Sequence, residues 1–139
     1  MLCALRHSIA PTVRRTVSTG VSSSLLWFSS ASNTGIGNGS EDDVRAAIDA
    51  TGVVIFSKSF CPFCRNVKVL FDSELKVPYT AYELDELPQG DEIQQSLVSI
   101  SGQRTVPNVF IGGKHVGGSD DTFAAHRSGK LQDLLDSIK

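Results

Sequence analysis

Apolar residues follow the periods of regular secondary structure from residue 40 onward. A first helix is predicted over about residues 40–51, since Ser40 and Asp43 have the spacing of a capping box and the next apolar residues share one helical face (Val44, Ala47 and Ile48). Residues 53–56 are a continuous run of β-branched and aromatic side chains, which predicts a strand buried on both faces. Pro62 suits the first turn of a second helix, whose inner face carries Val67, Leu70 and Phe71.

The rest of the chain continues this alternation of strands and helices. Apolar and polar side chains alternate over residues 79–84, which predicts a second strand. Residues 93–100 carry apolar side chains at helical spacing, which predicts a helix. A hairpin with a Gly-Gly turn is predicted over residues 108–116. One or two helices, interrupted around Gly129, are predicted over residues 120–138, with four apolar side chains on the inner face (Leu131, Leu134, Leu135 and Ile138). The order αβαβαββα implies an α/β domain whose mixed sheet carries helices on both faces.

The first 40 residues differ in composition from the rest of the chain. They contain three arginines, 13 serines and threonines and no acidic residue, whereas the other 99 residues hold 10 basic and 15 acidic side chains. Such a start is typical of a cleaved transit peptide, here for the mitochondrial matrix or alternatively a plastid. We therefore expect residues 1–39 to be a transit peptide that ends in a flexible linker at residues 33–39, and residues 40–139 to be the folded domain. A secretory signal and a merely disordered tail are the alternatives.

Composition limits the kind of protein that this chain can be. Its 139 residues, 40% hydrophobic and 20% charged, suit one globular domain. No apolar run reaches the roughly 18 residues of a bilayer-spanning helix, and the acidic domain shows no basic stripe. We therefore expect neither a membrane nor a nucleic-acid partner. Three cysteines, of which Cys3 lies in the expected transit peptide, are too few for a disulfide framework, so the remaining thiols should serve chemistry or metal binding.

The motif Cys61-Pro62-Phe63-Cys64 lies between the predicted buried strand and the start of the next helix. The sulfur of Cys61 is expected at the positive end of that helix, where free backbone N–H groups stabilise a thiolate. Lys58 adds a cation on the same side. Cys64, one turn later, should be less exposed yet within reach of a mixed disulfide on Cys61. Cys61 is therefore the predicted nucleophile and Cys64 the predicted resolving thiol.

Two plainer interpretations of the cysteine pair stay open. A Cys-x-x-Cys pair can be half of a structural zinc site, but such a site needs about four ligands, and His115 and His126 stand far along the chain at no metal-binding spacing. The two cysteines can also be inert core residues, although Pro62 and the strand-to-helix setting weigh against this. A redox role that needs no metal is favoured.

Three separated motifs resemble those of the glutaredoxins, specifically the dithiol kind. They are Lys58 with Cys61-Pro62-Phe63-Cys64, Thr105-Val106-Pro107, and Gly117-Gly118-Ser119-Asp120, and the resemblance covers about residues 41–139. It implies the thioredoxin fold, with a central mixed four-stranded sheet flanked by helices. It also implies a monomeric glutathione–disulfide oxidoreductase that acts on glutathionylated or disulfide-containing proteins. Glutathione would be the reducing co-substrate, itself renewed by a glutathione reductase system.

The resemblance also implies glutathione-binding roles outside the cysteine pair. It implies a cis bond before Pro107, which would present the backbone of Val106 to glutathione as a strand edge. The helix start at Ser119 and Asp120 would hold the γ-glutamyl end, and Lys58 with Gln94 the glycyl carboxylate. The expected contacts are Lys58, Phe63, Gln94, Thr105, Val106, Pro107, Gly118, Ser119 and Asp120. Without the resemblance, Ser119 and Asp120 would be taken for helix caps and Gln94 for a surface residue.

Two departures from the family pattern limit what the resemblance implies. Phe63 stands where many dithiol members have tyrosine, which keeps an aromatic wall and removes a hydroxyl. Members that hold a [2Fe–2S] cluster between two subunits commonly lack a proline after the first cysteine, and Pro62 stiffens that turn. A glutathione-ligated cluster carrier or redox sensor is therefore the alternative function. A thioredoxin-like reductase that needs no glutathione is a third, against which the Gly117–Asp120 segment argues.

Overall fold

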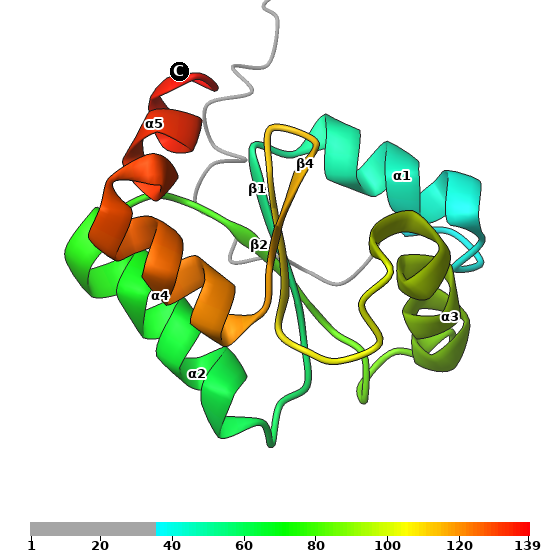
Figure 1. The fold of residues 1–139 in the computed structure, drawn as a ribbon. Helices are drawn as coiled ribbons and strands as arrows, with labels where there is room; N and C mark the ends of the chain where they lie inside the picture. The colour runs from blue at the N-terminus through cyan, green and yellow to red at the C-terminus, as the bar shows by residue number, and fades with distance from the viewer. Residues whose placement is uncertain (1–35) are drawn as a thin grey trace, which may run out of the picture.

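The computed structural model describes residues 36–139, which form alternating helices and strands (Figure 1). In chain order the elements are α1 (Glu41–Ala50), β1 (Val53–Ser57), α2 (Pro62–Val69), the π-helical segment η2 (Leu70–Leu75), β2 (Thr80–Glu83), α3 (Gly90–Ser101), β3 (Asn108–Ile111), β4 (Lys114–Gly117), α4 (Ser119–Ser128) and α5 (Lys130–Asp136). The predicted order is confirmed, with the last helical stretch divided in two. None of these helices is long and apolar enough to cross a membrane. The expected transit peptide, with Cys3 in it, lies outside the described residues.

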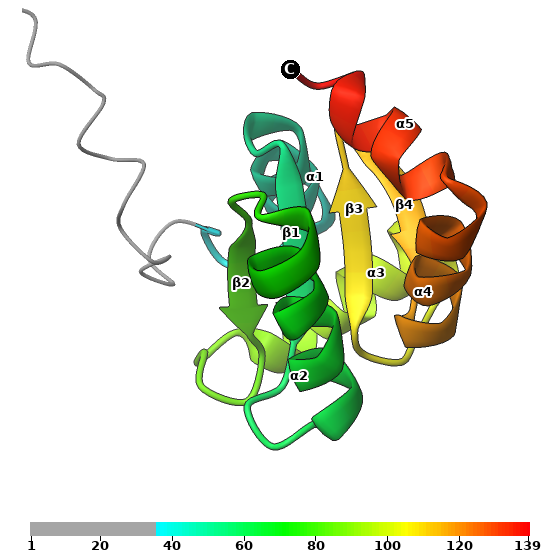
Figure 2. The same cartoon turned by 90° about the vertical axis from the view of Figure 1, so that its left-hand side faces the viewer.

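The four strands form one mixed sheet in the order β2-β1-β3-β4. β1 pairs in parallel with β2 and antiparallel with β3, and β3 pairs antiparallel with β4 through the hairpin. Helices α1 and α3 lie on one face of the sheet, and α2 and α4 lie on the other (Figure 1, Figure 2). The prediction of a mixed sheet with helices on both faces is therefore confirmed.

Side chains of the central strand β1 alternate between two hydrophobic layers. Val54 and Phe56 pack with α1 and α3, while Val53 and Ile55 pack with α2, η2 and α5. Phe56 stacks on Tyr82 of β2 with 5.4 Å between ring centroids. Every residue of β1 is buried, so the prediction of a strand covered on both faces is confirmed.

Local signals determine where several helices begin and end. The Ser40 hydroxyl accepts a hydrogen bond from the Asp43 N–H (3.2 Å), and the Asp43 carboxylate accepts from the Ser40 hydroxyl (2.8 Å) and the Asn38 N–H (3.0 Å). The bond from the Ser40 hydroxyl, followed by that from Asn38, holds the pKa of Asp43 below its usual value. The predicted cap of α1 is thus confirmed. Gly102 and Gly129 end α3 and α4 in the left-handed conformation that glycine adopts without strain.

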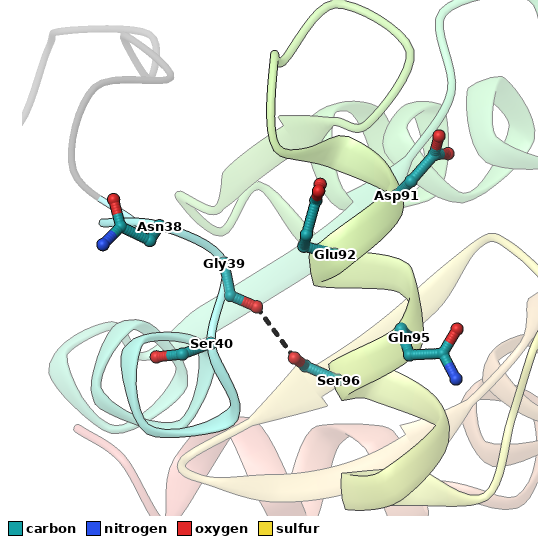
Figure 3. A pocket seen from close by; sticks show the side chains of 7 residues that line it. All are labelled: Asn38, Gly39, Ser40, Asp91, Glu92, Gln95 and Ser96. Carbon is teal, nitrogen blue, oxygen red and sulfur yellow. Dashed lines mark hydrogen bonds between the residues drawn. The ribbon is translucent and has the colours of Figure 1, made fainter.

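The folded domain begins earlier than predicted. The expected linker includes residues 36–39, but Ile36 is 1% exposed and belongs to the hydrophobic layer under α1 and α3. The Ser96 hydroxyl of α3 donates to the Gly39 carbonyl at 2.8 Å, the bond drawn in Figure 3, and the Gln89 amide donates to the Gly37 carbonyl at 2.9 Å. The linker prediction is therefore wrong for residues 36–39, because an apolar side chain and two backbone carbonyls find partners in the domain.

Two helix ends differ from the predicted pattern. Helix α2 continues directly into η2, whose last turn closes at Lys76 in a left-handed conformation (φ 51°). Ile138 was expected on the buried face of the last helix, but its side chain is 37% exposed. That prediction is wrong because α5 ends at Asp136, so Ile138 lies beyond the helical face that buries Leu131 and Leu135.

Candidate active site

Cys61 lies where the central strand gives way to a helix. A short loop follows Ser57, and Cys61 takes the N-cap position of α2 with an extended backbone (φ −82°, ψ 118°) ahead of Pro62. Its N–H donates to the Lys58 carbonyl (3.0 Å), and its carbonyl accepts from the Arg65 N–H (3.2 Å). No side chain caps this helix. Cys61 therefore stands at an open helix start.

The two sulfurs of the motif have different surroundings. Both thiols are free, and Cys61 is partly exposed whereas Cys64 is 1% exposed. The pKa of Cys64 is raised to about 12, mainly because burial disfavours its thiolate; a backbone contact from Lys58 and the charge of Lys68 act in the opposite direction, and Cys61 adds to the rise. Cys64 is therefore protonated at neutral pH. This asymmetry suits an outer thiol that attacks first and an inner thiol that acts second.

The loop before Cys61 is held by a carboxylate from the end of a neighbouring strand. Asp85, which follows β2, accepts hydrogen bonds from the Ser59 N–H (2.9 Å) and from the Ser59 hydroxyl. The hydroxyl bond, then the N–H bond, lowers the pKa of Asp85, with a smaller effect from the charge of Lys58. The ionised carboxylate thus fixes the turn that presents Cys61, and it leaves Phe60 72% exposed at the tip.

A groove of about 370 Å³ opens beside Phe63, between the segment before β3 and the start of α4. Seven of the nine predicted glutathione contacts line it: Phe63, Thr105, Val106, Pro107, Gly118, Ser119 and Asp120. They come from three segments that are distant in sequence. The sheet order brings these segments together, since β3 lies beside β1 and β4 leads from β3 into α4. The three motifs therefore meet in space, whereas the roles of the single residues remain predictions.

The backbone of Val106 is presented to the groove without partners of its own. The Val106–Pro107 peptide bond is cis, as the resemblance implied. The Gln103 amide donates to the Thr105 carbonyl and the Pro107 carbonyl, both at 2.9 Å, and so holds the chain on either side of Val106. Among the described residues, no group bonds to the N–H or C=O of Val106. Both backbone groups can therefore pair with an extended peptide.

The start of α4 forms the opposite wall of the groove. Gly118 takes the N-cap position, and its N–H donates to the Asp121 carboxylate (3.2 Å). The Thr122 hydroxyl donates to the Gly118 carbonyl at 2.7 Å. Asp120 is exposed and forms no ion pair or side-chain hydrogen bond within residues 36–139. Of the two first-turn carboxylates, Asp121 therefore caps the helix while Asp120 stays available to a ligand.

Two predicted glutathione contacts, Lys58 and Gln94, do not line the groove. The Gln94 amide donates to the Arg104 carbonyl at 2.7 Å, so it supports the loop that leads to Val106. Lys58 is half-buried and lies close enough to Asp85 to lower its pKa. Their expected contact with a glycyl carboxylate stays a prediction.

The groove also contains two residues that the sequence did not single out, Gln103 and Asp121. Asp121 had a local signal, because it stands three residues after the N-cap Gly118, where a carboxylate can reach back to the cap. Gln103 had none, since its two partners become neighbours only when the loop before β3 turns.

Other hollows in the described part of the chain carry less chemistry. A cavity of about 560 Å³ lies where residues 38–40 meet α3, and it is lined by Asp91, Glu92, amides and hydroxyls (Figure 3). It contains neither cysteine of the motif. Within residues 36–139, no three His, Cys, Asp or Glu side chains group together as metal ligands. The groove beside Phe63 differs in that one of its lining residues, Phe63, belongs to the Cys61–Cys64 motif itself.

Known proteins resemble this chain in sequence and in fold. The family model described as Glutaredoxin matches residues 53–116. Glutaredoxin-C8 of Oryza sativa subsp. japonica is 53% identical over 93 residues, which cover 66% of this chain and 68% of that relative. Glutaredoxin of Ricinus communis is 52% identical over 91 residues, 66% of this chain and 88% of the relative. The crystal structure of the buckwheat glutaredoxin–glutathione complex aligns with a TM-score of 0.69 at 41% identity and covers 78% of this chain and 96% of that one. The expected thioredoxin fold is confirmed.

Proposed function

The chain belongs to the glutaredoxin family and is a glutathione-dependent thiol oxidoreductase, and on that premise we propose that it removes glutathione from glutathionylated proteins with Cys61 as the nucleophile. One observation carries the proposal. The partly exposed thiol at the start of α2 stands next to a groove whose walls match the groups of a short acidic peptide. A disulfide that carries glutathione can therefore be recognised through its glutathione half.

The groups along the groove match glutathione from one end to the other. The free N–H and C=O of Val106 suit the peptide backbone around the cysteinyl residue. First-turn N–H groups of α4, at Ser119 and Asp120, suit the α-carboxylate of the γ-glutamyl residue. The Asp120 carboxylate suits its ammonium. Phe63, which is 59% exposed, gives an aromatic wall near the sulfur. This polarity directs the glutathione sulfur toward Cys61.

Deglutathionylation then proceeds through two exchanges at Cys61. The Cys61 thiolate attacks the glutathione sulfur, the bond to the protein sulfur breaks, and that sulfur leaves with the electron pair and takes up a proton. Cys61 is left carrying glutathione. A second glutathione thiolate attacks the bound glutathione sulfur, which releases oxidised glutathione and restores the Cys61 thiolate. Neither exchange uses Cys64.

Protein disulfides follow a second route that uses both cysteines. Cys61 attacks one sulfur of the substrate disulfide and forms a mixed disulfide with the protein. Cys64, one helical turn away, then attacks Cys61 and releases the substrate as a dithiol. Glutathione afterwards reduces the Cys61–Cys64 disulfide. The burial of Cys64 supports this order, because a bulky substrate reaches Cys61 first.

Glutathione-coupled reduction of a glutathionylated protein tests the proposal. Wild type, Cys61→Ser and Cys64→Ser are compared in the full chain, with Cys3→Ser present in every variant so that only the motif cysteines react. We expect Cys61→Ser to be inactive and Cys64→Ser to retain turnover. An inactive wild type, or an active Cys61→Ser, would contradict the proposal. An inactive wild type that purifies with a brown, glutathione-dependent chromophore would favour the [2Fe–2S] carrier instead.

We also propose that the segment before Ile36 directs import into the mitochondrial matrix. Its three arginines, its many serines and its lack of acidic residues support this. Residues 1–39 fused to a fluorescent protein should be taken up and shortened by isolated mitochondria. Uptake by chloroplasts alone would assign the plastid, and uptake by neither organelle would refute an import function.

A further inference from the structure

A largely buried ion pair lies across the sheet edge beside the active-site helix. Ser57, the last residue of β1, is fully buried and pairs in register with Glu83 of β2. The Ser57 hydroxyl donates to one Glu83 oxygen at 2.6 Å, and the other Glu83 oxygen pairs with the Lys68 ammonium. The Lys68 and Glu83 side chains are only 22% and 16% exposed. The cost of removing two charges from water largely cancels their attraction, so a buried ion pair adds little to the free energy of unfolding. Stability alone therefore does not account for this pair.

The cation of this pair stands one helical turn from Cys64. Residues four apart on a helix are neighbours on the same face, so Lys68 on α2 follows Cys64 along the side that meets the sheet. The ammonium is fixed there, because Glu83 holds it and Ser57 in turn holds Glu83. An unpaired lysine side chain would extend into water, whereas the Lys68 side chain, on the same helix as the buried Cys64 thiol, is held by Glu83.

Few other charges act on Cys64. The groups on its own helix that affect its pKa are Cys61 and Lys68. The loop before the helix adds a backbone group of Lys58. β2 contributes Glu83, which is paired with Lys68. Helix α4 packs against α2, but its His126 is paired with Glu74, ten residues beyond Cys64 along the chain. Lys68 is therefore the one side-chain cation, among these groups, that opposes the effect of burial on Cys64.

We propose that Lys68 is a positioning residue for the resolving step: held by Glu83 and Ser57, its ammonium stabilises the negative charge that develops on the Cys64 sulfur as this sulfur attacks Cys61. The inference rests on the two-cysteine route proposed above. In this proposal the buried pair acts on the step at Cys64, whereas the glutathione groove acts on the step at Cys61.

The step balances without any further reactant. The Cys64 thiol gives up its proton, and its sulfur forms a bond to the Cys61 sulfur. The bond between Cys61 and the substrate sulfur breaks, and the substrate sulfur leaves with the electron pair and takes up a proton. The two cysteines are oxidised by two electrons and the substrate disulfide is reduced by two. Glutathione later returns the cysteine pair to its dithiol state.

The first test measures the thiol itself. In the full chain carrying Cys3→Ser and Cys61→Ser, the rate at which iodoacetamide alkylates Cys64 is followed against pH. We expect Lys68→Met to move this profile to higher pH and to lower the rate at a fixed pH about tenfold, the change that one pKa unit produces. Lys68→Arg should keep the profile. Arg65→Met removes a cation from the exposed side of the same helix and should leave the profile in place.

Loss of Lys68 alone leaves the largely buried Glu83 carboxylate without a cation, which can unfold the protein. The double variant Lys68→Met/Glu83→Gln removes both charges and retains a hydrogen-bonding group for Ser57. We expect it to fold and to show the same displaced profile as Lys68→Met. An unchanged profile in this double variant would overturn the proposal, because the charge would then have no effect on Cys64.

The second test separates the two catalytic routes. With both motif cysteines present, Lys68→Met and the double variant should reduce a protein disulfide about tenfold more slowly and remove glutathione from a protein at the wild-type rate. Equal loss in both reactions would indicate a general defect and refute the assignment to the resolving step. If Cys64→Ser itself reduces protein disulfides as fast as wild type, then the two-cysteine route is wrong, a failure distinct from that of Lys68.

Discussion

Asp120 and Asp121 are neighbours in the first turn of α4, yet their side chains have different partners. Asp121 accepts the Gly118 N–H at 3.2 Å and caps the helix, while Asp120 lies in the groove without a partner among the described residues. We predict that Asp120→Asn weakens glutathione binding and that Asp121→Asn does so much less. Both changes remove one negative charge from the same helical turn, so both lose the same favourable interaction with the helix dipole.

The expected size follows from the exposure of Asp120. Hydrogen bonds to charged groups contribute about 1.5–3 kcal/mol, and water competes for an exposed carboxylate. The lower end of that range, about 1.5 kcal/mol, corresponds to roughly tenfold weaker binding. Since Asp120 is proposed to hold the γ-glutamyl ammonium of the glutathione half of the substrate, the loss should appear in the KM for the glutathionylated protein, while kcat at saturating substrate changes little.

Steady-state reduction at varied concentrations of the glutathionylated protein and a fixed excess of glutathione measures both constants for the two variants. Urea unfolding of each variant checks that any change is not a loss of fold. An equal rise of KM in Asp120→Asn and Asp121→Asn would mean that the net charge of the turn matters and that Asp120 makes no particular contact. An unchanged KM in Asp120→Asn would refute the orientation of glutathione proposed above.

Four further predictions concern the fold, the groove and the pH dependence of stability. Ile36→Ala should lower the free energy of unfolding in urea by about 2–5 kcal/mol because Ile36 is 1% exposed in the core; a negligible loss would mean that residues 36–39 are not part of the domain. Gly118→Ala should fold normally, since the added carbon meets its nearest atom at 3.4 Å, but should raise the KM for the glutathionylated protein because it fills the groove. Gly117→Ala should instead destabilise the protein in the same unfolding assay, because φ is +127° and the added carbon would clash with the Asp121 carboxylate. Equal stability of the two variants would contradict this. Partial burial lowers the pKa of His115 below its usual 6.5. As pH falls through that value, the unfolded chain therefore binds more protons than the folded one, and the free energy of unfolding should decline. His115→Gln should flatten this decline in urea unfolding measured across the same pH range, and an unaltered pH dependence would exclude His115 as its source.

Much of the fold followed from patterns within a few residues. The capping pair Ser40 and Asp43, the apolar run of β1 and the glycine that ends α3 each act through neighbours in the chain. Interactions of this range depend only on residues a few positions apart, so they can be predicted from a single sequence. The same holds for Cys61, whose place at a helix start needs only the following Pro62 and the strand before it.

The groove was predictable only through the family resemblance, because its walls lie about 40 and 55 residues beyond Cys61 in the chain. Where pattern-based prediction was wrong or silent, a long-range partner decided the outcome. The pattern gave no sign that the Gln94 amide supports the Arg104 carbonyl, ten residues further along the chain. Ile36 looked like part of a linker and instead fills the core.

Patterns within the sequence were enough to predict the alternation of helices and strands, most of the faces that they bury, and the presence of two thiols one helical turn apart. The tertiary structure alone decided that Asp120 is left for a ligand while Asp121 caps the helix, and that Lys68 is held beside Cys64 by Glu83. The physical reason is the reach of the interactions. Backbone hydrogen bonds and side-chain periodicity are local, whereas the partner of a long polar side chain is chosen by whichever group the packed sheet and helices bring within about 3 Å.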